Sequence, residues 1–209
     1  MMRPPAVTLC FQSGPIALSA VAGQLIHIWG PSGAGKSTLL SRIWGSRGIA
    51  DGRLEVRVPG WDLDLRALSP AHLAWTRPKL MAYLPQTPHV PPNVRVGDWF
   101  AATDWRLDEG LAALDLSHAL LTRCALELSG GELRRFCLLR VLFSDAPILL
   151  LDEPCTGLDP DRQARVEAIL RTARSKGRLV ISTGHAHAPD ADQSIRLPIG
   201  AGAQLVLEA

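Results

Sequence analysis

The chain has 209 residues, of which 47% are apolar, enough for one domain of ordinary size with a sizeable core. Its 22 Lys and Arg nearly balance its 20 Asp and Glu, whereas a dedicated nucleic-acid binder would show a concentrated basic surface. No apolar run is long enough to span a bilayer, and residues 1–5 lack the apolar core of a signal peptide. The four cysteines show no CxxC spacing, which is typical of a reduced, cytosolic protein.

The predicted elements alternate strands with helices. In chain order we expect strands at 7–11 and 24–29, a helix at 36–44, short strands and turns over 51–96, helical structure over 97–126, a buried strand at 148–151, an amphipathic helix over about 166–177 and a strand at 179–183. Such alternation predicts a mostly parallel sheet that binds ligands beyond the carboxyl ends of its strands. We therefore expect the chemistry just after Trp29, Leu151 and Thr183.

A glycine-rich turn follows the strand that ends at Trp29. Its residues fit the phosphate-binding pattern G-x-x-x-x-G-K-[ST]; they are Gly30, Pro31, Ser32, Gly33, Ala34, Gly35, Lys36 and Ser37, followed by Thr38. The glycines let backbone N–H groups point at phosphate oxygens, and the helix that begins near Lys36 adds its positive end. Lys36 would bind the β- and γ-phosphates, and the Ser37 hydroxyl would ligate Mg²⁺. The turn therefore predicts a site for MgATP.

Two adjacent carboxylates end the apolar strand at 148–151. Because side chains alternate along a strand, Asp152 and Glu153 point in different directions and need not share a role. Asp152 suits the Mg²⁺ shell, and Glu153 suits polarisation of the water that attacks the γ-phosphate. Two solvated carboxylates at a strand end are the alternative, and the phosphate-binding turn favours the catalytic interpretation.

A second anion site is predicted in the segment LSGGE at 128–132. Ser129, Gly130 and Gly131 offer a hydroxyl and exposed backbone N–H groups at the start of a helix, and Glu132 follows them. One nucleotide does not need two γ-phosphate sites in a single chain. We therefore expect this site to close on the nucleotide held by another copy.

With this segment the chain resembles the nucleotide-binding subunits of ABC transporters over nearly its whole length. The resemblance identifies Gln86 with the Q-loop that touches Mg²⁺ or water, Asp159 with the D-loop that crosses the dimer, and His185 with the switch histidine that reaches the γ-phosphate. It implies that the catalytic residues are Glu153, His185, Gln86 and Lys36. The implied metal ligands are Ser37, Gln86 and Asp152.

The resemblance also implies the fold and the cofactors. The expected fold class is α/β, a P-loop NTPase with a mostly parallel central sheet, an antiparallel β subdomain and a short helical subdomain. One domain would span residues 1–209, with the helical subdomain inserted in the catalytic core at approximately 90–140. ATP and Mg²⁺ are the implied cofactors.

The implied partners are a second copy, or a paralogous cassette, in a head-to-tail dimer and an integral membrane permease, with no nucleic acid. The chain would hydrolyse ATP and couple dimer closure to translocation, at the cytoplasmic face of the inner (plasma) membrane. A soluble ABC ATPase acting on nucleic acid or ribosomes is the alternative. Residues 13–44 and 82–86 look similar to vitamin B12 and iron-chelate importer ATPases, and the brevity of the chain resembles the haem-exporter ATPase of cytochrome c maturation.

Two positions depart from the family pattern. Gly184 separates Thr183 from His185, so we predict an extra residue there, such as a bulge, with His187 as a second candidate for the switch histidine. The family places an aromatic residue before the phosphate turn to stack on adenine. Phe11 is the candidate, and a buried core position is its alternative.

Overall fold

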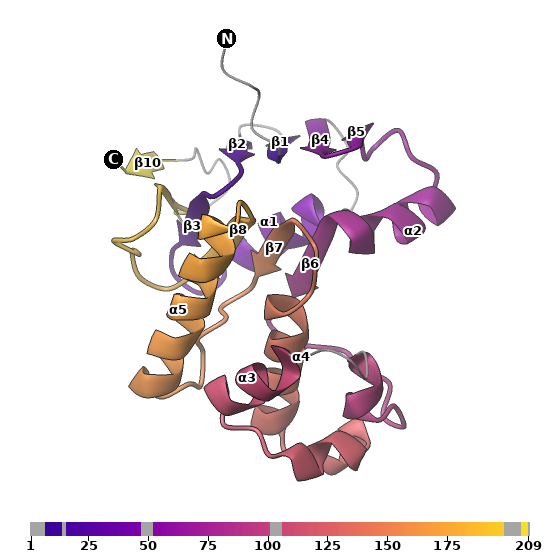
Figure 1. The fold of residues 1–209 in the computed structure, drawn as a ribbon. Coiled ribbons are helices and arrows are strands. Elements are labelled where there is room, and N and C mark those ends of the chain that lie inside the picture. The colour runs from indigo at the N-terminus through magenta and orange to yellow at the C-terminus, as the bar shows by residue number, and fades with distance from the viewer. Residues whose placement is uncertain (1–6, 14–15, 47–51, 101–105, 199–205, 209) are drawn as a thin grey trace. The chain divides into compact units, whose positions relative to one another are not determined.

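The computed structural model describes residues 7–13, 16–46, 52–100, 106–198 and 206–208 (Figure 1). Contacts divide the chain into two compact units. The first lies within residues 1–85, 145–154 and 172–209, and the second within 86–144 and 155–171.

A mostly parallel sheet lies at the centre of the first unit. Over the described ranges it has six strands in the order β10–β9–β3–β8–β7–β6. These strands are β3 (Leu25–Trp29), β6 (Met81–Leu84), β7 (Ile148–Leu151), β8 (Leu179–Gly184), β9 (Gln193–Arg196) and β10 (Val206–Glu208). Every neighbouring pair is parallel except β9 with β10. All four residues of β7 are buried, because a central parallel strand is covered on both faces.

An antiparallel sheet belongs to the same unit, with strand order β2–β1–β4–β5. Its strands are β1 (Thr8–Ser13), β2 (Ile16–Val21), β4 (Gly52–Val58) and β5 (Trp61–Asp64). In β4 the buried residues are Leu54, Val56 and Val58, so alternate side chains face the core as expected for a sheet with one solvated face. The α/β fold with a parallel and an antiparallel sheet is confirmed.

Among the described residues, two whole helices lie in the first unit. α1 (Lys36–Ile43) follows β3 and buries Leu39, Leu40 and Ile43 on one face. α2 (Pro70–Leu80) lies in the segment where only strands and turns were predicted. Its first turn is capped because the Ser69 hydroxyl accepts the N–H of His72 at 3.3 Å, and proline is favoured at the first helical position.

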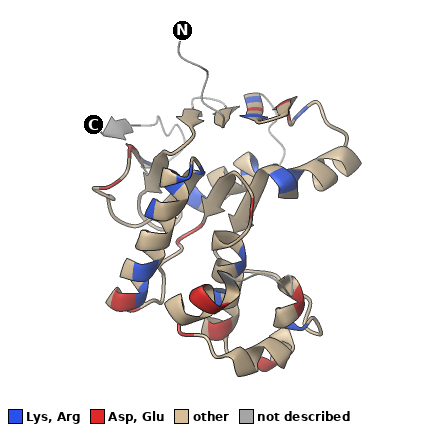
Figure 2. Cartoon of the chain, viewed as in Figure 1, with Lys and Arg blue, Asp and Glu red and all other residues tan. Residues whose placement is uncertain are grey.

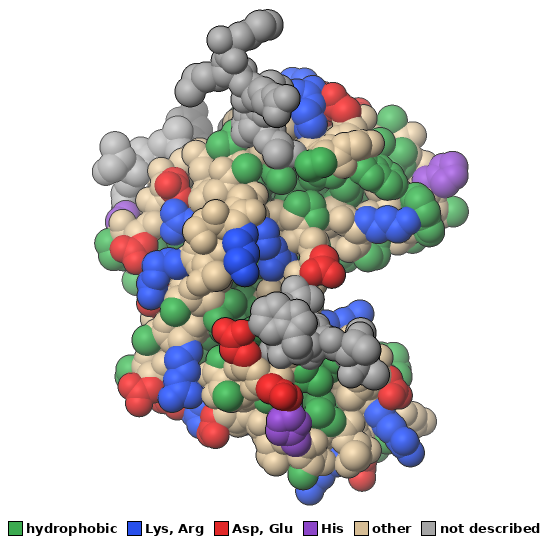
Figure 3. All heavy atoms as spheres, viewed as in Figure 1, with side chains coloured by type: hydrophobic (Ala, Val, Ile, Leu, Met, Phe, Trp, Pro, Cys, Tyr) green, Lys and Arg blue, Asp and Glu red, His purple; other side chains and the backbone are tan. Residues whose placement is uncertain are grey.

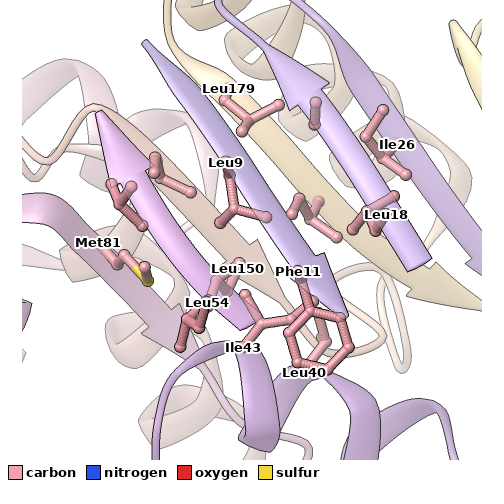
Figure 4. Packing of buried hydrophobic residues seen from close by; sticks show 14 of the residues in the cluster. Leu9, Phe11, Leu18, Ile26, Leu40, Ile43, Leu54, Met81, Leu150 and Leu179 are labelled. Atoms are coloured by element: carbon pink, nitrogen blue, oxygen red, sulfur yellow. The ribbon is translucent and has the colours of Figure 1, made fainter. Parts of the chain in front are cut away.

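One hydrophobic core joins both sheets and α1. Figure 4 shows part of it, with Leu9, Phe11, Leu18 and Leu54 from the antiparallel sheet, Ile26, Met81, Leu150 and Leu179 from the parallel sheet, and Leu40 and Ile43 from α1. The ring of Phe11 is 2% exposed and lies beside Leu40 and Ile43. The structure therefore contradicts stacking of Phe11 on adenine and supports the core alternative, because the surrounding core covers the faces of the ring.

The second unit is built mainly from helices. It contains α3 (Arg106–Ala113), α4 (Gly130–Leu142) and most of α5 (Pro160–Ser175), with 3-10 turns at Val96–Trp99, His118–Thr122 and Ala125–Glu127. In the coloured ribbon of Figure 2, α3 carries acidic residues and α5 carries residues of both signs. The helical expectation over 97–126 is only partly right among the described residues, which leave out 101–105, since short 3-10 turns replace much of the helix. No helix in the described ranges combines the length and apolar character needed to cross a membrane.

Candidate functional site

The glycine-rich turn connects β3 to α1 as predicted. Gly33 and Gly35 have φ of 81° and 94°, in the left-handed region that glycine adopts most readily. Lys36 lies under the turn and is 5% exposed, and its Nζ donates to the carbonyl oxygens of Gly30 at 2.8 Å and Pro31 at 3.1 Å. The turn therefore holds its cation in place with its own backbone.

The acidic pair follows β7 and is buried. Asp152 is 0% exposed, and its Oδ1 accepts the hydroxyl of Thr183 at 2.7 Å. The same hydroxyl oxygen accepts the backbone N–H of Glu153 at 2.9 Å. Thr183, at the end of β8, therefore fixes both the side chain of Asp152 and the backbone of Glu153.

Two predicted residues, Lys36 and His185, converge on a carboxylate oxygen of a third, Glu153. Glu153 Oε1 lies 3.8 Å from Lys36 Nζ and 3.1 Å from His185 Nε2. These residues follow β3, β7 and β8, whose carboxyl ends meet at one edge of the sheet because the strands are parallel neighbours. The structure thus brings together the ends of the three strands where chemistry was expected.

The geometry distinguishes the two candidate histidines. His185 reaches Glu153 while its side chain stays 56% exposed. His187 turns elsewhere, and its ring meets Trp29 edge-on with centroids 6.2 Å apart.

The predicted bulge at Gly184 is wrong: β3 and β8 pair without a break, and Gly184 pairs with Trp29 as the last residue of β8. The strand is simply one residue longer than predicted.

The residues around Glu153 fit a magnesium ion. Asp152 and Glu153 are two buried carboxylates at the carboxyl end of β7, and Lys36 pairs with Glu153. A divalent cation bound there would place further positive charge beside these carboxylates. The donors expected for it, the Ser37 hydroxyl and the Asp152 carboxylate, are the oxygen ligands that Mg²⁺ prefers.

The other predicted residues lie in the second unit. Gln86 is exposed, and its backbone carbonyl accepts a hydrogen bond from the guanidinium of Arg134. Asp159 precedes α5, where its carboxylate accepts the N–H of Arg162 at 2.9 Å and pairs with the guanidinium of that residue. Hydrogen bonding to the Arg162 backbone holds the pKa of Asp159 below its ordinary value.

The LSGGE segment forms the start of α4. Ser129 caps the helix by accepting the N–H of Glu132 at 3.2 Å, and the Glu132 carboxylate accepts the Ser129 N–H at 2.8 Å and hydroxyl at 2.7 Å. These bonds lower the pKa of Glu132. Gly130 and Gly131 are exposed, and an added Cβ would meet nothing within 4 Å at Gly130 and only the Arg135 Nη1, at 3.6 Å, at Gly131. Packing within the chain therefore does not require glycine at either position.

Sequence reasoning missed two residues of this site. Thr183 was seen only as a strand end, and its role depends on β7 lying beside β8. His27, inside β3, was not considered, although a histidine within the apolar run Leu25–Trp29 is itself a signal. Its side chain bonds to Ser182 and to the carbonyl of Ala186, next to His185.

The sequence is similar to one family of known proteins. Residues 14–156 match the family model described as ABC transporter. The chain is 33% identical to the phosphonates import ATP-binding protein PhnC of Polaromonas sp., over 81% of this chain and 66% of that protein. It is 32% identical to the vitamin B12 import ATP-binding protein BtuD of Escherichia coli, over 82% and 70%. The chain thus spans about two thirds of the length of these curated relatives.

Solved structures show the same fold. An ATP-binding subunit of an ABC transporter superposes with a TM-score of 0.73 at 19% identity, over 92% of this chain and 85% of the other. A dimeric ATP-binding cassette bound to ADP and Pi in a post-hydrolysis state gives 0.72 at 23% identity, over 92% of both chains. The match of the family model over most of the chain, together with its relatives, shows that this chain belongs to the ABC transporter family.

Proposed function

We propose that this chain binds MgATP and hydrolyses it as the energy-supplying subunit of a transporter. The observation that carries the proposal is the convergence of Lys36 and His185 on Glu153 Oε1, at 3.8 and 3.1 Å. A cation for phosphate, a carboxylate to act as base and a histidine beside that carboxylate are groups suited to phosphoryl transfer to water.

Each residue has one role in this proposal. Lys36 exchanges its bonds to the Gly30 and Pro31 carbonyls for the β- and γ-phosphates, which are stronger acceptors because they are charged. Glu153 accepts the proton of the attacking water. His185 orients that carboxylate and donates to the γ-phosphate. These groups are positioned before the nucleotide arrives, so little reorganisation is needed during the reaction.

Magnesium, when bound, neutralises charge on the phosphates. We assign the Ser37 hydroxyl and the Asp152 carboxylate to hold it. Thr183 keeps Asp152 oriented through the 2.7 Å bond described above.

A second cassette would complete the site through its LSGGE segment. Ser129, Gly130, Gly131 and Glu132 would face the nucleotide held by the partner, with Asp159 near the dimer axis. Two observations support this: packing within the chain does not require either glycine, and the sequence has two glycine-rich helix starts, at 30–37 and 128–132, but only one acidic pair that ends an apolar strand. Glycine at these positions lets a phosphate approach the backbone closely.

The membrane partner would be a separate permease, with this chain held at the cytoplasmic face of the inner membrane. The relatives named for phosphonate, thiamine and vitamin B12 import support a transport role. Because their three substrates differ, the similarity reflects the shared ATP-binding cassette and does not indicate one transported substrate. An ATPase acting on nucleic acid or ribosomes is less well supported, because basic and acidic side chains are interspersed on the face of the described residues in Figure 3.

The proposal is tested with Glu153→Gln. This variant should keep ATP binding, lose turnover by on the order of a hundredfold or more, and accumulate as an ATP-bound dimer on size exclusion. Glu109→Gln removes an exposed carboxylate of α3 and is the matched control, with parental turnover expected. Parental turnover by Glu153→Gln, without an ATP-dependent dimer, would show that Glu153 is not the base.

The head-to-tail arrangement is tested by a disulfide in a variant whose native cysteines have been replaced. With Ser129→Cys and Ser32→Cys together, ATP should promote a bond between two chains, seen as a covalent dimer on a non-reducing gel. A bond that forms within one chain would refute the arrangement. Ser129→Cys alone and Ser32→Cys alone, each in the same cysteine-free background, provide the control for random oxidation.

A further inference from the structure

His27 is a buried histidine in the strand that leads into the phosphate turn. It is 9% exposed, and it lies between Ile26 and Ile28, which face the core. Its Nδ1 lies 2.9 Å from the Ser182 hydroxyl of β8, and its Nε2 lies 3.0 Å from the carbonyl oxygen of Ala186. The ring therefore links β3 to β8 and to the residue that follows His185.

The two bonds define the protonation of the ring. A carbonyl oxygen only accepts, so Nε2 carries a proton and donates to Ala186. In the neutral ring Nδ1 then accepts from the Ser182 hydroxyl. Burial, the largest influence, lowers the pKa of His27, and the charge of His187 acts in the same direction, which favours the neutral ring.

Gly184 leaves space for this ring. A Cβ at Gly184 would lie 2.9 Å from Cε1 and 3.0 Å from Nε2 of His27, closer than side-chain atoms normally pack. The ring thus lies against the backbone just before His185 and hydrogen-bonds to the backbone just after it. Together these contacts constrain both sides of His185.

We propose that His27 is a positioning residue, which holds the segment Gly184–Ala186 so that His185 points at Glu153. The inference rests on the proposed function, because it needs His185 to act in hydrolysis. The 3.1 Å approach of an exposed side chain to a buried carboxylate depends on a fixed backbone, and the anchored ring of His27 supplies that restraint. A misplacement of about 1 Å can cost on the order of a hundredfold in rate.

Three substitutions separate the two bonds of the ring. His27→Gln keeps an amide N–H at about the depth of Nε2, His27→Asn reaches only the depth of Nδ1, and His27→Leu keeps neither. We expect kcat to fall by on the order of tenfold for the Leu and Asn variants and by less than about threefold for Gln, with KM for ATP unchanged. If His27 only filled space, the kcat of the Gln variant should not exceed that of the Asn variant.

A control uses the other neighbour of His27 in the sheet. Ser194 pairs with His27 from β9, is 3% exposed, and its hydroxyl has no hydrogen-bond partner among the described residues. Ser194→Ala therefore changes a buried polar group beside the ring without touching the His185 segment. Its kcat should equal that of the parent.

The decisive measurement repeats His27→Leu in a His185→Ala background, below the melting temperature of each variant. If His27 acts through His185, adding His27→Leu to the His185→Ala variant should change its kcat by less than about twofold. Equal losses in both backgrounds, or full activity of His27→Asn, would overturn the inference and leave the proposed function standing. Parental turnover of His185→Ala would instead remove His185 from the mechanism, and the inference with it.

Discussion

The close contact between Gly184 and His27 makes a prediction about stability. Gly184→Ala places a methyl group about 0.5–1 Å inside ordinary contact distance of the ring, judged against a normal separation of about 3.5–4.0 Å. The ring cannot withdraw without losing its bonds to Ser182 or Ala186. Gly184 is extended within β8, so alanine adds no backbone strain, and the cost is the steric overlap alone.

Overpacking of this kind costs about 1–3 kcal/mol. For a chain of this size each kcal/mol lowers Tm by about 2–4 °C, so we expect a loss of about 2–12 °C in a thermal melt. In a His27→Ala background the ring is gone, and Gly184→Ala should cost almost nothing. Gly130→Ala, where an added Cβ meets no atom within 4 Å, is the control and should leave Tm nearly unchanged.

The parent, the two single variants and the double variant form a cycle, in which the Tm change caused by Gly184→Ala is compared with and without the His27 ring. A Tm loss of the same size with and without the His27 ring would refute the steric account. So would a Gly184→Ala protein as stable as the parent.

Three further predictions concern single groups. Lys36→Ala should weaken MgATP binding by about ten- to a hundredfold, measured by calorimetry, because it removes a charged donor; an affinity within about twofold of the parent would contradict the phosphate site. Thr183→Val should cost about 1–3 kcal/mol in a denaturant melt and also lower turnover, since Asp152 loses a buried donor; unchanged stability would refute that bond. Burial raises the pKa of Cys137 to about 11 from an ordinary 9.0, so the folded state keeps a thiol proton that the unfolded state releases. Stability should therefore fall between pH 9 and 11, and Cys137→Ala should remove part of that fall in melts across the range, because burial also raises the pKa of Cys155 to about 11.

The central site could be predicted from sequence because its residues follow short apolar strands. The runs before Gly30 and Asp152 are buried on both faces, and a parallel sheet collects the ends of such strands at one edge. The pattern therefore predicted which residues would meet. It did not reveal the bonds of Thr183, because these depend on which strand lies next to β7.

The missed helix α2 has a physical explanation. Of its eleven residues only Thr76 and Leu80 are buried, so the helix shows little apolar periodicity, and Pro78 argues against a helix in any pattern-based reading. Its signal is local instead: Ser69 before Pro70 is a favoured start. The prediction for 97–126 erred in the opposite direction. Its leucines suggested continuous helix, but they lie on short 3-10 turns as well as on α3.

The strand register around Gly184 could not be predicted from the sequence either. Whether a residue extends a strand or bulges from it depends on the partner strand, and the partner here is β3. Phe11 is similar, because an aromatic residue before the phosphate turn is equally suited to a ligand or a core until its neighbours are known.

The backbone of Glu153 has a consequence for engineering. This residue has φ of 51°, a left-handed conformation that costs a non-glycine residue roughly 1–2 kcal/mol. Glycine would adopt it without that cost, so a library screened only for heat resistance would enrich Glu153→Gly and select proteins that lack the proposed catalytic base. Thermostabilisation of this cassette must therefore exclude position 153 from the library.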